Sequence, residues 1–288
     1  MASKQYISLI RLFQHCDISA EGDIHVTRIK KQLNAEFDFA KDGFIEINGY
    51  SYNKNDVFEE IEKPGFTERL FHHKKIWEKK AVLAILEDNA LNLFDLRNQI
   101  KTFANDASFE QFFSPYFVIP FNYISRKYIN ENQLSDLGDW LLFDDFLQPD
   151  EREEGLRTIR IFLEEKLRIL RNVNKETFVS KRPEIMEWLT SGGGNFLSNL
   201  PHEFYSEKSD IALYLINLTV AIQKSEKRDC KRVSTVLTCV KDLPEELEKL
   251  ITNNHKAYTQ GGSSSSNTNY GWIIWVVIIV LKLLSGGC

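Results

Sequence analysis

The sequence predicts a mainly α-helical protein: a helical cytoplasmic domain with a small N-terminal α+β module and a C-terminal transmembrane helix. Three observations support this fold class. Apolar residues recur at helical spacing through most of the chain after Thr67. Near the N-terminus, an Asn48-Gly49 pair separates two short runs of alternating apolar residues, which is typical of a β-hairpin. The last nineteen residues contain a nearly unbroken apolar run.

Composition places the chain among folded globular proteins and limits its partners. Its 288 residues are 43% hydrophobic and 27% charged, with a net charge of −5. An acidic balance disfavours nucleic-acid binding, which usually depends on excess Lys and Arg. The four cysteines follow no CxxC spacing, and the N-terminus lacks the apolar core of a signal peptide. These features predict that the bulk of the chain lies in the reducing cytoplasm.

Residues 1–63 are expected to form the α+β module, in the order helix, helix, hairpin, helix. The hairpin strands are predicted at Phe44–Ile47 and Tyr50–Asn53, and Asn55 is expected to cap a short acidic helix after them. This order also fits a winged-helix arrangement. We favour a packing or adaptor module, because the second helix offers few basic residues and its neighbour is acidic.

A calcium-binding loop is the one metal site that the sequence suggests. Asp17, Ser19, Glu21 and Gly22 occupy positions of an EF-hand loop, but the closing position, where a bidentate Glu belongs, is Arg28. A cation there repels calcium. We therefore predict no metal ligand, and we read the stretch as a turn between two helices.

Residues 64–258 are predicted to form the helical domain. Adjacent His72 and His73 point about 100° apart on a helix, so they are expected to be an exposed pair and not a chelating one. The aromatic stretch 103–123 is expected to be core, broken into two helical halves at Pro115 and Pro120. The longest helix is predicted at residues 150–172, a helix opened by Pro183 at 184–189, and an irregular loop at the glycine cluster 191–195.

A basic stretch follows the very apolar helix expected at residues 211–222. Such a cluster gains about 1 kcal/mol per basic residue at an anionic bilayer surface, so it is a candidate lipid-facing patch. The alternative is a solvated turn between helices. The candidate residues are Lys224, Lys227, Arg228, Lys231 and Arg232.

The C-terminal end is predicted to be a linker followed by an anchor. Residues 259–269 are rich in Gly, Ser and Asn, as flexible tethers are, and residues 270–288 are the expected membrane segment. Apolar residues from Trp272 to Leu284 rise only about 20 Å as a helix, less than the roughly 30 Å hydrocarbon core. Aromatic residues at one end and a lysine near the other nevertheless favour a bilayer. The anchor residues are Tyr270, Trp272, Trp275, Ile278, Ile279, Leu281, Lys282 and Leu284.

Function is predicted from this layout, because the sequence offers no catalytic signature. It has no nucleophile elbow, phosphate-binding loop, dinucleotide fingerprint or metal-ligand spacing, so we name no catalytic or cofactor-binding residue and expect no cofactor. We expect a single-pass, tail-anchored protein whose cytoplasmic domain is an interaction, scaffold or signal-sensing module. Membrane lipid and an unidentified protein are its expected partners, and a homo-oligomer is left open. The alternatives are an effector that disrupts membranes by clustering its short anchor, and a membrane-tethered enzyme.

Overall fold

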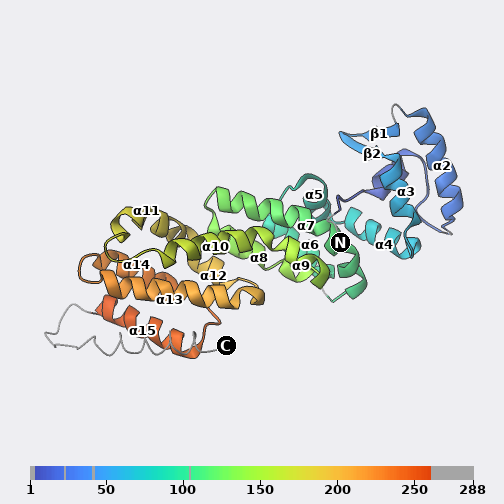
Figure 1. The fold of residues 1–288 in the computed structure, drawn as a ribbon. Coiled ribbons are helices and arrows are strands. Elements are labelled where there is room, and N and C mark those ends of the chain that lie inside the picture. Colours follow the sequence, from blue (N-terminus) through green and yellow to red (C-terminus); the bar gives the residue numbers. More distant parts are fainter. Residues whose placement is uncertain (1–3, 23, 41–42, 104, 261–288) are drawn as a thin grey trace, which may run out of the picture. The chain divides into compact units, whose positions relative to one another are not determined.

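The computed structural model describes residues 4–22, 24–40, 43–103 and 105–260, and it is mainly helical with one two-stranded antiparallel sheet (Figure 1). The chain divides into two compact units. Unit 1 comprises residues up to Lys127 together with Phe143–Thr158, and unit 2 comprises Tyr128–Leu142 and the residues from Ile159 onward. The predicted domain boundary after residue 63 lies inside unit 1.

Unit 1 begins with the predicted order of helix, helix, hairpin and helix. These elements are α1 (Leu9–His15), α2 (Val26–Phe39), β1 (Phe44–Ile47), β2 (Tyr50–Asn53) and α3 (Lys54–Glu62). The hairpin is confirmed at the predicted residues, with Ile47 opposite Tyr50 and Phe44 opposite Asn53. Both turn residues have positive φ, 51° at Asn48 and 88° at Gly49, as a tight two-residue hairpin turn requires.

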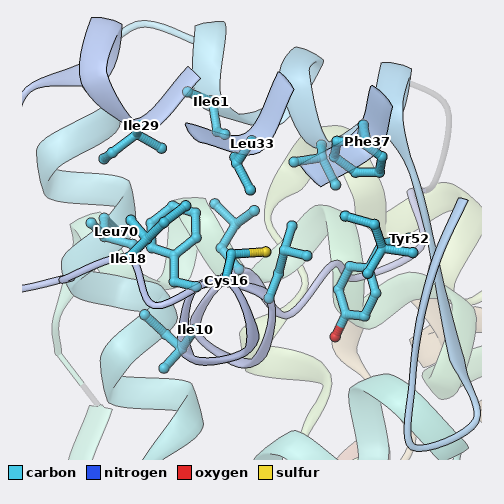
Figure 2. Packing of buried hydrophobic residues seen from close by; sticks show 14 of the residues in the cluster. Ile10, Cys16, Ile18, Ile29, Leu33, Phe37, Tyr52, Ile61 and Leu70 are labelled. Atoms are coloured by element: carbon cyan, nitrogen blue, oxygen red, sulfur yellow. The ribbon is translucent and has the colours of Figure 1, made fainter. Parts of the chain in front are cut away.

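The core of this part of unit 1 is a cluster of apolar side chains from α1, α2, the hairpin, α3 and the next helix (Figure 2). Leu9, Leu12, Phe13 and Leu33 are completely buried in it. The cap of α3 differs from the prediction by two residues. Asn53, the last residue of β2, accepts hydrogen bonds through its side chain from the backbone N–H groups of Asn55 and Asp56. The strand therefore passes directly into the helix, because one residue both ends β2 and caps α3.

The remaining elements of unit 1 are helical. They are α4 (Phe66–Trp77), α5 (Lys80–Asp88), α6 (Leu93–Ile100), η2 (Lys101–Phe103), α7 (Ala107–Asn130, up to residue 127), η3 (Asp144–Phe146) and α9 (Pro149–Gly155). The helix expected at 150–172 is in fact two helices, because α9 ends at Gly155 and α10 begins at Arg157. A Cβ on Gly155 would lie 2.6 Å from a methyl carbon of Leu147, so this position has no room for a side chain.

Most of the aromatic stretch lies in α7, and its Phe side chains there are core as predicted, but the helix is not broken. Pro115 and Pro120 both lie within one continuous helix. A proline inside a helix costs about 3 kcal/mol, whereas each buried Phe contributes about 1.5–3 kcal/mol. The helix continues because it buries many rings: Phe109, Phe113, Phe117 and Phe121 follow one another along one face, with ring centroids 4.9–5.6 Å apart.

Unit 2 is a second helical assembly with its own core. Its elements are α8 (Leu134–Leu141), α10 (Arg157–Arg171, from residue 159), α11 (Phe178–Trp188), the π-helical segment η4 (Leu189–Gly193), α12 (Gly194–Ser198), η5 (His202–Phe204), α13 (Tyr205–Ile222), α14 (Lys227–Leu237) and α15 (Glu245–Gln260). The core of unit 2 includes the fully buried side chains of Trp140, Phe178, Phe196 and Phe204.

Three expectations for unit 2 were wrong. Pro183 lies inside α11 instead of opening a helix, and α13 begins six residues before Ile211. The glycine cluster is a kink between helical segments instead of a loop, because Gly192 has non-helical φ and ψ inside η4. Gly192, with φ of 111°, lets the backbone turn within η4, and a Cβ there would lie only 2.3 Å from the backbone nitrogen of Ser135. Tight packing against α8 therefore explains why glycine stands at this position.

The predicted transmembrane helix lies in residues 261–288, outside the described residues. Within the residues that the structure does describe, no helix has both the length and the apolarity needed to cross a bilayer. The predicted linker lies outside them as well, apart from residues 259 and 260 at the end of α15.

Candidate functional site

A buried glutamate on α3 is the centre of the most highly connected polar cluster in unit 1. Glu60 lies between Val57 and Ile61 on the core-facing side of α3, and it is only 3% exposed. A buried carboxylate is costly unless charged or hydrogen-bonding groups surround it. The groups around Glu60 therefore show how its buried carboxylate is stabilised.

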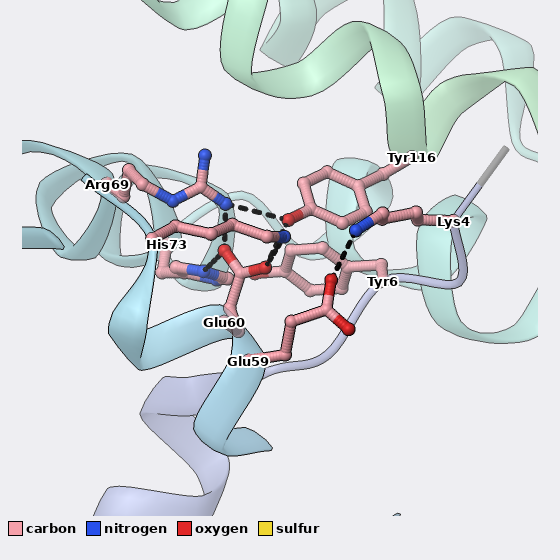
Figure 3. A network of polar contacts seen from close by, with 8 residues as sticks. Lys4, Tyr6, Glu59, Glu60, Arg69, His73 and Tyr116 are labelled. Carbon is pink, nitrogen blue, oxygen red and sulfur yellow. Dashed lines mark hydrogen bonds and ion pairs between the residues drawn. The ribbon is translucent and has the colours of Figure 1, made fainter. Parts of the chain in front are cut away.

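Four side chains converge on the Glu60 carboxylate (Figure 3). Lys63, one turn further along the chain, and Arg69 of α4 both donate to it. Tyr116 of α7 donates its hydroxyl hydrogen to Oε2 at 2.7 Å and accepts from the Arg69 guanidinium at 2.9 Å. The fourth, His73 of α4, lies with Nε2 3.4 Å from Oε1. The cluster thus joins α3, α4 and α7.

His73 is completely buried, which corrects the expectation of an exposed histidine pair. Tyr6 lies 3.1 Å from its Nδ1, so a single neutral tautomer fits both neighbours: Nδ1 accepts from the Tyr6 hydroxyl and Nε2 donates to Glu60. Burial lowers the pKa of His73, and the Glu60 carboxylate opposes this only in part. His72 is 3% exposed and packs on the rings of Phe109 and Phe112.

The charges of the network are fixed by its geometry. Burial opposes ionisation of Glu60, but hydrogen bonds from His73 and Lys63 and the positive charge of Arg69 outweigh it and hold the Glu60 pKa well below its usual range. Burial, reinforced by the nearby Glu60 charge, raises the pKa of the Tyr116 hydroxyl. The network therefore holds a carboxylate, the Arg69 guanidinium, the Lys63 ammonium, a neutral imidazole and a protonated phenol.

The N-terminal segment 4–8 is attached to this network. Lys4 donates from its backbone N–H to the carbonyl of Pro115 and pairs through its ammonium with Glu59 at 2.5 Å. Tyr6 packs edge-on against Tyr116 with ring centroids 5.5 Å apart. An extended piece of chain is thus held in place between α3 and α7.

A cleft of about 720 Å³ lies between this segment and β2. Every residue of β2 lines it, whereas no residue of β1 does. Tyr50, which lines this cleft, is held by two contacts. The Arg11 guanidinium lies 3.7 Å from its ring centroid, and its hydroxyl donates to Asp88 at 2.8 Å. The other tyrosines that line the cleft are Tyr6, Tyr52 and Tyr116.

A second cavity in unit 1, of about 760 Å³, contains a serine beside a histidine. Ser108 donates its hydroxyl to Glu68, and His72 Nε2 lies 2.9 Å from the same oxygen. Because the single hydroxyl hydrogen is given to Glu68, His72 must donate to the serine. Nδ1 of His72 is buried without a hydrogen-bond partner. A nucleophilic serine needs the reverse arrangement, with the imidazole as acceptor and Nδ1 held by an acid.

The five residues of the predicted basic patch lie in unit 2, and the structure brings three of them to one groove. Lys224 lies in the turn after α13, and the other four lie on α14. Arg228, Lys231 and Arg232 line a groove of about 1150 Å³, whereas Lys224 and Lys227 do not. The predicted anchor residues, Tyr270 to Leu284, lie outside the described residues.

The EF-hand-like stretch does not gather ligands in the described structure. Ser19 accepts from the backbone N–H of Glu21, so its oxygen is used in a local turn. Among the described residues, which omit Asp23 of this stretch, no group of three or more His, Cys, Asp or Glu side chains is placed to hold a metal ion.

Sequence reasoning missed the Glu60 network. One local signal was present: Glu60 is three residues after Val57 and one before Ile61, which puts a charge on the apolar stripe of a helix. Its partners Arg69, His73 and Tyr116 are 9 to 56 residues away. No local pattern could have joined them.

Comparisons of the chain with protein-family models, with curated proteins and with solved structures found no match.

Proposed function

We propose that the protein is a membrane-tethered interaction module, in which residues 270–288 anchor the chain in a bilayer and the cleft of unit 1 binds an extended segment of a partner protein. The single observation that carries the proposal is the free edge of β2 in that cleft. Within the described residues β2 pairs only with β1, so its second edge has no strand beside it.

The register of the hairpin indicates which backbone groups are free. Ile47 and Tyr50 flank a two-residue turn, so they form a hydrogen-bonded pair, and the next pair, Glu46 with Ser51, does not exchange hydrogen bonds. The N–H and C=O of Ser51 therefore point away from β1. Ser51 is exposed and lines the cleft. An extended peptide can hydrogen-bond to such an edge as an added strand.

The side chains of the cleft favour a partner segment that carries Lys or Arg. Five carboxylates and two lysines line it, so negative side chains are in excess. The four tyrosines offer broad contact surfaces at low cost in conformational entropy, as they do in the binding loops of antibodies. Because the Glu60 network and Arg11 already hold two of these rings, binding would require little further ordering.

Backbone substitution tests the binding site. Ser51→Pro removes the outward N–H of β2, whereas Glu46→Pro removes the equivalent N–H of β1, which points to the opposite edge; neither should cost a hairpin hydrogen bond. Extended peptides selected from a random display library on the full-length protein should lose at least tenfold in affinity with Ser51→Pro and little with Glu46→Pro. Equal effects of the two variants, or selection of helical peptides only, would refute strand addition.

Fractionation tests the anchor. The full-length chain should resist carbonate extraction from membranes, because its apolar terminal run follows a polar linker. A chain ending at Gln260 should be released into the soluble fraction. Retention of the shortened chain in the membrane pellet would contradict the proposed anchor.

A further inference from the structure

The groove of unit 2 is built from η4, α12 and α14. On α14 it is lined by Arg228, Lys231, Arg232 and Thr235, which recur at intervals of three and four and so share one helix face. α12 approaches this helix closely, since a Cβ on Gly194 would lie 3.1 Å from the carbonyl oxygen of Val236. A glycine at this position thus allows the close approach of the two walls.

The groove concentrates positive charge in an acidic protein. Four cations line it and no carboxylate does: Arg228, Lys231, Arg232 and Lys241. All four are exposed, and none forms an ion pair with any residue that the structure describes. Two other arginines of unit 2 do have acidic partners: Arg182 pairs with Asp229 and Arg171 with Asp210. In a chain of net charge −5, this concentration of unpaired cations indicates an anionic ligand.

The remaining lining is apolar or already hydrogen-bonded. Val236 and Cys239 provide apolar surface, whereas Leu189, which also lines the groove, is only 1% exposed. Thr235 donates its hydroxyl to the Lys231 carbonyl, and Ser198 donates to the Cys239 carbonyl. Recognition would therefore rest on the four cations, with an apolar surface beside them. This combination suits a molecule with an anionic head and an apolar body.

We propose that this groove binds the phosphate-bearing headgroup of an anionic phospholipid, with the start of its acyl chains against the apolar wall. The proposal rests on the membrane tethering proposed above. The composition of residues 261–269 predicts a flexible tether, and a Gly-rich chain of nine residues spans about 15–18 Å on average, which is about 5–6 Å times the square root of its length. α15, whose last residue is Gln260, would thus stay beside the bilayer surface, together with the described part of unit 2.

Cys239 provides a native reporter of the groove, because it is exposed and lines it, while Cys16 and Cys230 are buried. Full-length protein carrying Cys288→Ser would be inserted into nanodiscs of phosphatidylcholine alone or with one-fifth phosphatidylserine. Maleimide labelling of Cys239 would then be followed by mass spectrometry. We expect labelling to be at least fivefold slower in the anionic discs.

Charge-neutral variants show whether the groove itself is responsible. Lys231→Gln with Arg232→Gln should abolish the difference between the discs, whereas Lys224→Gln with Lys227→Gln, which removes the same charge outside the groove, should preserve it. Equal loss in both pairs would show diffuse surface attraction, and equal labelling rates of the parent protein in both discs would show no lipid in the groove. Either result overturns the proposal.

Two further conditions of the labelling experiment identify the source of the anion. In phosphatidylcholine discs, millimolar glycerophosphoserine or a micromolar oligoglutamate peptide should leave the labelling rate unchanged. Protection by the first would assign the groove to a soluble phosphate compound, and protection by the second to an acidic protein segment; both overturn the lipid assignment. Co-elution of protein with the discs reports the anchor separately, so a failed anchor is distinguishable from an empty groove.

Discussion

Tyr116 on α7 donates its hydroxyl hydrogen to the Glu60 carboxylate on α3 at 2.7 Å, across 56 residues of sequence. This bond connects the helix that follows the hairpin to the aromatic helix of unit 1. The carboxylate is buried, and two half-buried cations donate to it, Lys63 and Arg69. Removing the charge of one member of such a group leaves the others uncompensated.

Glu60→Gln should therefore destabilise unit 1 by about 3–5 kcal/mol, the usual cost of breaking a buried ion pair. Hydrogen exchange of α3 and α4, read by mass spectrometry, reports this free energy for unit 1 alone. The matched control is Glu59→Gln. Glu59 pairs with Lys4 but its side chain is 62% exposed, so neutralising it should change the stability of unit 1 far less than neutralising Glu60 does. Equal effects of the two substitutions would contradict the role given to Glu60.

Unit 1 should lose stability as the pH falls from about 7.5 to 5.5. Burial lowers the pKa of both His72 and His73 below the ordinary value of 6.5. On acidification the unfolded chain therefore takes up protons before the folded one does, so the free energy of unfolding decreases. Each histidine can add at most about 1.4 kcal/mol per pH unit to this slope.

Urea denaturation at several pH values measures this slope. A variant with His72→Gln and His73→Gln should show a flatter dependence above pH 5. Glu60 acts in a lower window: because its folded pKa is lowered, its contribution is present above its usual value of 4.5 and lost as the pH falls below it. An increase in stability as the pH falls from 7.5 to 5.5 would rule out buried neutral histidines.

The thiols should differ sharply in reactivity. Burial raises the pKa of Cys16 and of Cys230 to about 11, and both are enclosed, whereas Cys239 is exposed. In a Cys288→Ser protein, a disulfide reagent at pH 8 should therefore titrate one thiol in the native state and three after denaturation in guanidinium. Rapid reaction of a second thiol in the native protein would show that one of the buried cysteines is accessible.

Gly192→Ala should destabilise unit 2 for two reasons. Its φ of 111° is unfavourable for a residue with a side chain, and the new Cβ would lie 2.3 Å from the Ser135 nitrogen. Gly49→Ala in unit 1 tests the first reason alone, since φ is 88° but nothing lies within 4 Å of a Cβ there. The conformational part costs about 1–3 kcal/mol. Hydrogen exchange of α8 and η4 measures the loss of stability caused by Gly192→Ala, and exchange of the hairpin measures the loss caused by Gly49→Ala. The first loss should be clearly larger than the second.

The hairpin could be predicted because all the information for it is local. Asn48 and Gly49 tolerate positive φ, and the alternation of side chains fixes the register on both sides. The mainly helical class followed in the same way from periodicity. Helix ends were less predictable: no local pattern indicates that Gly155 faces Leu147, and this contact lies at the break between α9 and α10.

The Glu60 network could not be predicted because its contacts join residues that are distant in sequence. Helical geometry correctly shows that His72 and His73 point in different directions, but it does not show that α7 covers both. The basic stretch on α14 was recognisable from composition. The groove that it lines was not, since the opposite wall comes from η4 and α12, about 35 residues earlier.

The prolines of α7 have a consequence for how the chain is made. Pro115 and Pro120 together penalise an isolated helix by about 6 kcal/mol, so α7 should not form on its own in the nascent polypeptide. It needs the rings that it packs against, and one of these is Phe146, which contacts Phe113 and Phe117 from beyond the end of the helix. Residues 143–158 complete unit 1. The ribosome must therefore release the chain as far as residues 143–158 before the first unit can close.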